Sequence, residues 1–472
     1  MSEKIMYALY SFLLTFVSSV VGLFFLKSFQ LEGYKLKNYI KKIVKFQFVS
    51  FDKNRLNYTK RIKRLIFLDF FLNFWLFFLI FYSLNNAFVI LIVVIFIFIR
   101  PIEIVLSFLI AMPFEEFIKK QFIKKAKNKL AKMKCKKIAI TGSFGKTTTK
   151  NILYQILSEE FDVCATPKSF NTPMGVCKTI LENLKETDDI FVVELGARHK
   201  GDIKFLADFV GVDFGIITPI GKCHLETFGT IENIESTKFE LCESAKQFVV
   251  FNGTNKSTKS LFERFERKKF LVCDNGSFAY AKNITTNSEG SEFDMVLDKK
   301  VFHCKTKLLG QANIDNIVVA STMAYLLGEN VYNILRGIKN VQQVAHRLEI
   351  IKSDVATVID DSYNSNFDGF CQALEVLKGF EGRKIVVSPG VVELGKEQYE
   401  TNLKIGKKIF EYADIFVIMN KTNKEALFEG AKEFGREIYF ANTRQEQKEI
   451  LKKVVKAGDV VLFENDLPDN YR

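Results

Sequence analysis

An apolar run that leads directly into a glycine turn and a Lys-Thr pair constrains the fold of this chain more than any other feature. Residues 138–141 are apolar and then polar, and they are followed by Gly142, Ser143, Phe144, Gly145, Lys146, Thr147 and Thr148. Glycines let backbone N–H groups approach phosphate oxygens, and the N-terminus of a following helix adds a favourable dipole. Lys146 can reach outer phosphates and Thr147 can offer a hydroxyl to Mg²⁺. The segment predicts a strand, a phosphate-binding loop and a helix.

The pattern of apolar and polar residues after residue 136 predicts an α/β fold with a parallel sheet. Short β-branched runs alternate there with periodic polar and apolar segments, the pattern of alternating strands and helices. We expect a central phosphate-binding domain over residues 136–347 and a Rossmann-like C-terminal α/β domain over residues 348–472. The expected strands cover residues 137–140, 190–194, 214–218, 355–359, 384–388, 415–419 and 460–463.

The first 118 residues predict a membrane region. Residues 5–26 contain no charge, and a bilayer crossing needs about 20 residues. No small-residue cleavage site follows, which favours a retained anchor over a signal peptide. Residues 65–84 form a second expected span, in which Asp69 and Asn73 are expected to reach the interface near the basic end of the segment.

A third span over residues 87–110 is less well defined, because the apolar run stops at Arg100-Pro101. Either the membrane span continues through Arg100 and Glu103, which pair one helical turn apart, or it ends there and residues 102–112 lie along the interface. The basic loop 27–64 and the basic linker 119–135 are both expected in the cytoplasm. Three crossings satisfy this, with residues 1–4 outside, a turn at Asn85-Asn86 and the α/β part in the cytoplasm.

Charge and cysteines exclude several classes of protein. The formal net charge of +13 is concentrated beside the apolar spans, which favours a bilayer partner and gives no support to nucleic-acid binding. Eight cysteines are scattered without paired spacing, so reduced thiols in a cytosolic compartment are expected, and no zinc site is indicated.

Three more residues carry candidate chemistry. Glu194 ends an apolar run, and a carboxylate at the carboxyl end of a parallel strand can complete a Mg²⁺ shell begun by Thr147. His224 and Lys238 follow the next expected strand, His224 being one of four histidines. In isolation, a lone histidine is more often structural and a lone lysine is usually solvated.

The order and spacing of these motifs resemble the Mur ligase family. The resemblance extends through the Thr-Gly-x-x-Gly-Lys-Thr-Thr loop, Glu194-Leu-Gly-Ala and His224-Leu-Glu-x-Phe-Gly, and covers about residues 136–472. Further matching positions are Asn171, Gly175-Val176, Lys238, Gly310, Asn313, Asn316, His346-Arg347-Leu-Glu349 and Asp360-Asp361-Ser-Tyr363-Asn364-Ser-Asn366.

The resemblance implies a role for each matching residue. Lys146 and Thr147 would hold ATP phosphates and Mg²⁺, Glu194 the first of two ions, and His224 the second. Lys238 occupies the position that the family carbamylates, which turns a cation into a carboxylate-like metal ligand. Asn171 resembles the partner of the phosphate loop. Nucleotide contacts are implied for Asn313, Asn316, Arg347 and Asp361.

The implied activity is ATP-dependent amide-bond ligation through an acyl phosphate, with ADP and phosphate as products. The motifs resemble most the subgroup that adds D-alanyl-D-alanine to UDP-MurNAc-tripeptide in peptidoglycan synthesis. A related ligase acting on another carboxylate, as in poly-γ-glutamate synthesis, is an alternative, and a non-catalytic membrane scaffold is a weaker one.

The chain departs from the family in several places. The membrane region stands where the family has a soluble domain for the uridine nucleotide, so the contacts to that part of the substrate are open. Phe367 and Cys177 replace prolines, and Ser388-Pro389-Gly390-Val391-Val392-Glu393 stands where the family favours Gly-Asp-Met.

Overall fold

The computed structural model describes residues 3–45, 56–83, 86–353, 355–363 and 365–467; the side chains of residues 3–4, 86–98 and 352 lie outside the described part. The chain divides into a helical unit, Met1–Phe122, and an α/β unit, Ile123–Arg472.

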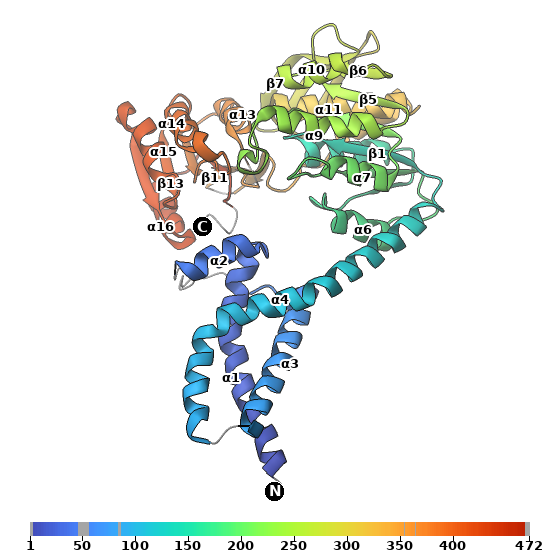
Figure 1. The fold of residues 1–472 in the computed structure, drawn as a ribbon. Helices are drawn as coiled ribbons and strands as arrows, with labels where there is room; N and C mark the ends of the chain where they lie inside the picture. Colours follow the sequence, from blue (N-terminus) through green and yellow to red (C-terminus); the bar gives the residue numbers. More distant parts are fainter. Residues whose placement is uncertain (1–2, 46–55, 84–85, 354, 364, 468–472) are drawn as a thin grey trace. The chain divides into compact units, whose positions relative to one another are not determined.

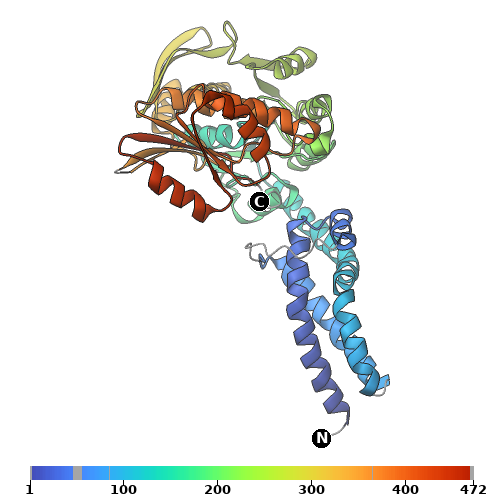
Figure 2. The ribbon, with the colours of Figure 1, turned by 90° about the vertical axis from the view of Figure 1, so that its left-hand side faces the viewer.

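The helical unit consists of long apolar helices and one short amphipathic helix (Figure 1). Figure 2 shows α1 and α3 side by side along much of their length. Two described helical segments, Ile5–Leu31 and Lys60–Ser83, are long and apolar enough to cross a membrane. The bounds are α1 Glu3–Leu31, α2 Leu36–Val44, α3 Lys60–Ser83 and α4 Asn86–Leu130.

Both apolar helices expose large hydrophobic side chains. Phe16 of α1 is 59% exposed and Phe67 of α3 is 72% exposed. Trp75, the single tryptophan of the chain, is half exposed on α3 and makes edge-to-face contacts with Phe71 and Phe78. Such faces lack a partner in water and suit a lipid environment.

A buried ion cluster ties the apolar helices together, and we call Arg100, Asp69 and Glu103 the Arg100 cluster. Arg100 is fully buried; its Nη2 and Nη1 donate to the two Asp69 oxygens at 2.6 and 3.0 Å. Nη1 also donates to Glu103 at 2.5 Å, and Nε donates to the Ser18 carbonyl at 3.1 Å. The expectation that Asp69 reaches the interface is therefore wrong, because a buried carboxylate is stabilised by a bidentate guanidinium.

The same cluster contains the pairing of Arg100 with Glu103 that the first alternative expects. Helix α4 continues through Arg100 and Glu103, and it contains Pro101 and Pro113. The helix also extends to Leu130, so most of the expected linker 119–135 is helical. The turn expected at Asn85-Asn86 falls partly on residues 84–85, which lie outside the described part, as do the side chains of the first half of the third expected span.

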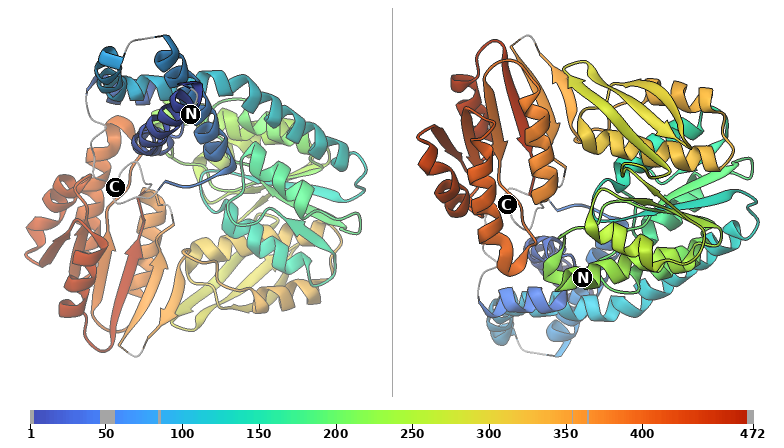
Figure 3. Two further views of the ribbon diagram at one scale, coloured as in Figure 1. Left: turned by 90° about the horizontal axis from the view of Figure 1, so that it is seen from below. Right: turned by 90° about the horizontal axis from the view of Figure 1, so that it is seen from above.

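The α/β unit begins with a sheet of nine described strands in the order β2-β3-β1-β4-β5-β6-β7-β8-β9. Strands β2 to β7 pair in parallel, whereas β7, β8 and β9 pair antiparallel (Figure 3). The bounds are β1 Lys136–Thr141, β2 Val163–Ala165, β3 Ile190–Glu194, β4 Phe214–Ile217, β5 Phe248–Asn252, β6 Lys269–Val272, β7 Ala279–Asn287, β8 Gly290–Leu297 and β9 Lys300–Thr306.

Helices cover this sheet and supply most of its core. Ile152 and Ile156 of α5 and Ile317 and Val318 of α11 pack with Ile138 of β1 in one buried cluster. The bounds are α5 Lys146–Leu157, α6 Pro173–Glu182, α7 Asp202–Val210, α8 Leu225–Phe228, α9 Ile231–Ser244, α10 Lys256–Arg264, α11 Gly310–Leu326 and α12 Val331–Asn340.

A second sheet of six described strands follows, in the order β10-β11-β15-β12-β13-β14. Only the pair β10 and β11 is antiparallel among them, and helices α13, α15 and α16 pack against the sheet (Figure 2). The bounds are β10 Glu349–Lys352, β11 Ala356–Asp361, α13 Phe367–Lys378, β12 Lys384–Ser388, α14 Gln398–Ile409, β13 Ile415–Met419, α15 Lys424–Ala431, β14 Glu437–Ala441, α16 Arg444–Val454 and β15 Asp459–Glu464.

The parallel strands that form most of each sheet confirm the predicted fold class, and every strand expected from the sequence is present. The antiparallel extension β7–β9 was not expected. The eight cysteines are all free thiols, as expected.

Candidate active site

The glycine turn after β1 is held close to the neighbouring strand β4. Gly142 has φ +149°, and a Cβ added there would lie 2.0 Å from the Thr218 hydroxyl oxygen. The Ser143 amide donates to the Pro219 carbonyl at 2.9 Å. Gly145, with φ +73°, is the residue before the first turn of α5. Only glycine fits both positions without strain, so the turn delivers Lys146 and Thr147 to the start of α5.

Lys146 folds back over its own loop. Its Nζ donates to the carbonyls of Gly142 and Ser143 at 3.0 and 2.9 Å. Burial lowers the pKa of Lys146, and the nearby Glu194 partly offsets this. An ammonium that is bound only by neutral carbonyls is ready to pair with an incoming phosphate.

Glu194 lies at the end of β3 and contacts polar side chains from two other segments, helix α5 and the loop before α6. Its Oε2 accepts from the Thr147 hydroxyl at 2.9 Å, and its Oε1 accepts from the Asn171 amide at 2.9 Å. Lys150 Nζ lies 3.4 Å from Oε2, and both side chains are buried. The sequence analysis did not select Lys150, although it lies one helical turn after Lys146.

Thr147 and Glu194 form a donor set that suits Mg²⁺. The ion prefers hard oxygen ligands and is held in nucleotide sites by a few protein oxygens together with substrate phosphates. A hydroxyl and a carboxylate within 2.9 Å of each other beside a phosphate-binding loop meet this requirement. The residues therefore fit the metal that the sequence predicted.

His224 and Lys238 lie on the other side of the loop. His224 immediately precedes α8, and its Nδ1 contacts the Glu393 carboxylate. Lys238 on α9 is 3% exposed and, among the described residues, its ammonium has no hydrogen bond or ion pair. Burial first and then Lys146 lower the pKa of Lys238 to about 8.

Asn313 and Asn316 of α11 line the pocket beside the phosphate loop. Asn316 Oδ1 accepts from the Thr149 hydroxyl at 3.0 Å and would lie 2.8 Å from a Cβ at Gly145. Asn313 Nδ2 donates to the Leu309 carbonyl at 2.9 Å. Both side chains are buried, and Asn316 contacts the start of α5 through Thr149.

The second sheet contributes Arg347 and Asp361. The Arg347 guanidinium lies 4.3 Å from the centre of the Tyr363 ring, whose hydroxyl donates to Ser169 at 2.5 Å. Burial raises the pKa of Asp361 to about 6, and the charge of Arg347 partly opposes this. Arg347 and Asp361 line the same pocket as the phosphate loop.

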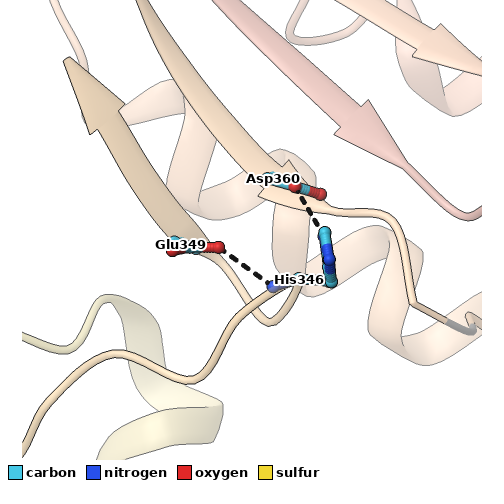
Figure 4. A group of neighbouring side chains, drawn as sticks. All are labelled: His346, Glu349 and Asp360. Atoms are coloured by element: carbon cyan, nitrogen blue, oxygen red, sulfur yellow. Dashed lines mark hydrogen bonds and ion pairs between the residues drawn. The ribbon is translucent and has the colours of Figure 1, made fainter.

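A neighbouring cluster holds the segment that bears Arg347 (Figure 4). His346 Nδ1 lies 2.8 Å from Asp360 Oδ2, and the Glu349 carboxylate accepts from the His346 amide at 3.1 Å. Glu349 and Asp360 are paired across β10 and β11. The three groups lie close enough together to hold a cation. Their hydrogen bonds to one another already give each group a structural role, which is to fix the segment to the edge of the sheet.

One pocket of about 570 Å³ brings the predicted site residues together. Its lining includes every site residue chosen from the sequence: Gly142, Ser143, Phe144, Gly145, Lys146, Thr147, Thr148, Asn171, Glu194, His224, Lys238, Asn313, Asn316, Arg347 and Asp361. The lining also includes Ser169, Arg198, His199 and Tyr363, which the sequence analysis did not select as site residues.

Two protein-family models match the chain over the region that builds this pocket. Residues 140–324 match the Mur ligase middle domain, and residues 346–464 match the Mur ligase glutamate ligase domain. The chain belongs to the Mur ligase family.

Relatives of this Mur ligase include two bacterial enzymes of one name. The UDP-N-acetylmuramoyl-tripeptide--D-alanyl-D-alanine ligase of Haemophilus influenzae is 28% identical over 278 residues, which cover 58% of this chain and 61% of that protein. The Bacillus subtilis enzyme of the same name is 25% identical over 355 residues, or 72% of this chain and 74% of that protein. The chain thus spans about 61% of the length of the Haemophilus relative.

A solved structure agrees with the Mur ligase fold. The MurF ligase from Thermotoga maritima in complex with ADP has a TM-score of 0.68 and 26% identity, and the similarity covers 74% of this chain and 80% of that one. The predicted family and fold are confirmed.

Proposed function

We propose that this Mur ligase adds D-alanyl-D-alanine to UDP-MurNAc-tripeptide at the expense of ATP, for peptidoglycan synthesis. The two relatives named above have that reaction as their name. The observation that carries the proposal is the convergence in one pocket of the phosphate loop, the Thr147 and Glu194 oxygens, and Arg347 from the second sheet.

The proposed reaction has two steps. A carboxylate oxygen of the tripeptide attacks the γ-phosphorus of ATP, and the bond from that phosphorus to the bridging oxygen breaks, which gives an acyl phosphate and ADP. The amine of the dipeptide then attacks the acyl carbon and loses a proton, and phosphate leaves with the electron pair of the carbon–oxygen bond. The net products are an amide, ADP and phosphate.

The residues of the chain have separate tasks in this scheme. The Lys146 ammonium and the backbone N–H groups at the start of α5 offset the charge of the transferring phosphoryl group. Arg347 approaches the nucleotide from the second sheet, and the buried pocket limits hydrolysis of the acyl phosphate. Bound Mg²⁺, held by Thr147 and Glu194 with a second ion near His224, would further offset negative charge.

We also propose that Lys238 is carbamylated. Its buried ammonium has no anionic partner in hydrogen-bonding range among the described side chains, although it lines a pocket that would hold cations. A carbamate carries a negative charge and two oxygens, which suits a metal ligand at this place. A carbamate on Lys238 would join His224 in holding the second ion.

A direct assay tests the main proposal. The full chain, purified in detergent, is incubated with ATP, Mg²⁺ and UDP-MurNAc-tripeptide, with and without D-alanyl-D-alanine, and pentapeptide and phosphate are measured. We expect equal amounts of pentapeptide and phosphate, both dependent on the dipeptide. Absence of pentapeptide, or release of phosphate without dipeptide, contradicts the proposal.

We propose that the helical unit anchors the ligase in the cytoplasmic membrane of a bacterium. The apolar lengths of α1 and α3 and the basic residues that flank them support two crossings. Because both basic segments belong in the cytoplasm, the first half of α4 is then the third crossing. A cytoplasmic reporter fused after Arg472 should be active, and a fusion active only outside the cell contradicts this topology.

The domain limits also remain proposals. We assign residues 1–118 to the membrane region, 136–347 to the central domain and 348–472 to the C-terminal domain. The end of α12 at Asn340 and the start of β10 at Glu349 support the second boundary. Limited proteolysis in detergent should release fragments that end near these positions.

A further inference from the structure

The contact between His224 and Glu393 joins two parts of the chain that are 169 positions apart. His224 belongs to the loop between β4 and α8, whereas Glu393 follows β12 in the second sheet. The Glu393 carboxylate contacts Nδ1 of the imidazole, and both side chains are partly buried. A carboxylate on one sheet domain therefore holds a histidine of the other.

The backbone at both ends of this contact is unusual. His224 has φ +51° and Glu393 has φ +65°, a region that residues other than glycine rarely adopt. Such conformations persist where the surrounding structure imposes them, and they are enriched at functional sites. The Glu226 amide also donates to the Glu393 carbonyl at 3.4 Å, so backbone and side chain meet at the same place.

The chemistry of the contact determines the state of the imidazole. A neutral imidazole has one N–H donor and one lone pair for accepting or for binding a metal. An ionised Glu393 can only accept, so it favours the proton on Nδ1 and leaves the lone pair on Nε2. Histidines that bind metals commonly donate their other ring N–H to a carboxylate in this way.

We propose that Glu393 is a positioning residue for the second metal ion, which it serves by orienting His224 from the C-terminal domain. The proposal rests on the metal role of His224 in the proposed function. Since the carboxylate and the imidazole come from different domains, the site is complete only when the two domains are in contact. Domain contact and metal affinity are then coupled.

The same pair of loops provides a matched control. Lys222 Nζ lies 2.7 Å from the Glu397 carboxylate, two residues before His224 and four residues after Glu393. Both of these side chains are about half exposed. Glu397→Ala removes a contact between the same loops without touching the imidazole.

Titration of Mn²⁺ measures the coupling without reference to turnover. Mn²⁺ is added to the full chain in detergent with a saturating non-hydrolysable ATP analogue, and free Mn²⁺ is measured by electron paramagnetic resonance. We expect Glu393→Ala to weaken one Mn²⁺ site about 10- to 100-fold. Glu393→Gln keeps an acceptor oxygen and should lose less Mn²⁺ affinity. Glu397→Ala should bind Mn²⁺ as tightly as the unsubstituted protein does.

Nitrogen NMR of the histidines supplies a second readout. The chain has only four histidines, so the His224 signals can be assigned with His224→Ala. The signal of an Nδ1-protonated imidazole should be present in the unsubstituted protein and lost in Glu393→Ala. A structural role alone would leave this tautomer unchanged.

The outcomes separate this inference from the proposed function. Unchanged or tighter Mn²⁺ binding in Glu393→Ala, or an equal loss in Glu397→Ala, overturns the role of Glu393. If His224→Ala lowers affinity and Glu393→Ala does not, only the positioning role fails. If His224→Ala leaves both Mn²⁺ sites unchanged, the metal assignment in the proposed function fails as well.

Discussion

The chain contains two buried groups of charges that are satisfied in opposite ways. In the Arg100 cluster, the guanidinium donates to Asp69, Glu103 and the Ser18 carbonyl. In the pocket, Lys146 has only carbonyl partners and Lys238 has neither a hydrogen bond nor an ion pair among the described residues. In the first group the cation is paired with carboxylates of the same group. In the second group the two ammonium groups are not paired with a carboxylate among the described residues, so they can bind an anionic ligand.

This difference separates structural charges from functional ones. Burying a charge costs free energy, which a closed network recovers through strong hydrogen bonds. In a pocket with an unpaired cation, the free-energy cost of burying the charge is offset only when an anionic ligand binds. Removal of a charge should therefore destabilise the helical unit but mainly reduce activity in the pocket.

The largest effect is expected for Lys146→Ala. The loss of Lys146, whose ammonium folds over the phosphate loop, should lower the rate of ADP formation on the order of a thousandfold or more. Thermal unfolding should change little, because the partners of Lys146 among the described residues are carbonyls. Lys178→Ala, an exposed lysine of α6, serves as a control and should retain full activity. Near-normal ADP formation in Lys146→Ala would contradict the phosphate role.

Arg100→Leu should have the opposite profile. It leaves Asp69 buried without its cation, which should cost about 3 kcal/mol of unfolding free energy. Denaturant titration in detergent, followed by circular dichroism, measures this loss. Combination with Asp69→Asn should recover part of it.

Arg64→Leu is the control for this variant. The Arg64 guanidinium binds Glu115 but is 36% exposed, so its loss should cost at most about 1 kcal/mol. If Arg100→Leu is no less stable than Arg64→Leu, the Arg100 cluster does not hold the helices together.

A smaller effect is expected for Lys238→Ala. Loss of the carbamate should reduce ADP formation roughly a hundredfold, because one metal ligand disappears while the phosphate loop stays intact. Addition of a short carboxylate such as acetate should restore part of the activity. Lys204→Ala, which removes an exposed lysine of α7, should not respond to acetate. Full activity of Lys238→Ala without any additive would exclude this lysine from the mechanism.

The smallest effect is a gain in stability for Asp361→Asn. The pKa of Asp361 is raised from 3.8 to about 6, so the folded state favours the protonated form. Ionisation of Asp361 is therefore unfavourable in the folded state. Its protonated form contributes stability that is fully present below pH 3.8 and is lost as the pH rises through about 6. Asp361→Asn should melt a few degrees higher at pH 7.5, and the gain should vanish near pH 3.5. A variant that melts lower than the unsubstituted protein at pH 7.5 would contradict this sign.

The sequence predicted the site better than it predicted the surroundings of the site. Strand β1 and the glycine turn form one continuous motif, so Lys146 and Thr147 were identified from local pattern alone. Glu194 was found because its apolar strand ends at a carboxylate. Such features depend on neighbours in the chain, which a single sequence displays.

The missed features depend on tertiary contacts. Glu393 becomes notable only where it meets His224, and the loop that bears it has no regular periodicity. Asp69 resembled an acid near the interface until Arg100, 31 positions away, was seen to bind it. The strands β7–β9 were missed because their alternation of exposed and buried residues is interrupted, as at the register shift between Lys282 and Thr285.

The single tryptophan on α3 gives the helical unit an optical signal of its own. Residues 123–472 contain no tryptophan, so the intrinsic indole emission of the chain comes only from Trp75. The α/β unit therefore adds no tryptophan emission of its own when a ligand binds in the pocket. With its indole half exposed among phenylalanines, its emission should shift to the blue in lipid bilayers. Brominated lipids should quench it. The unsubstituted chain thus carries a built-in reporter of whether α3 enters a bilayer, with no label and no substitution required.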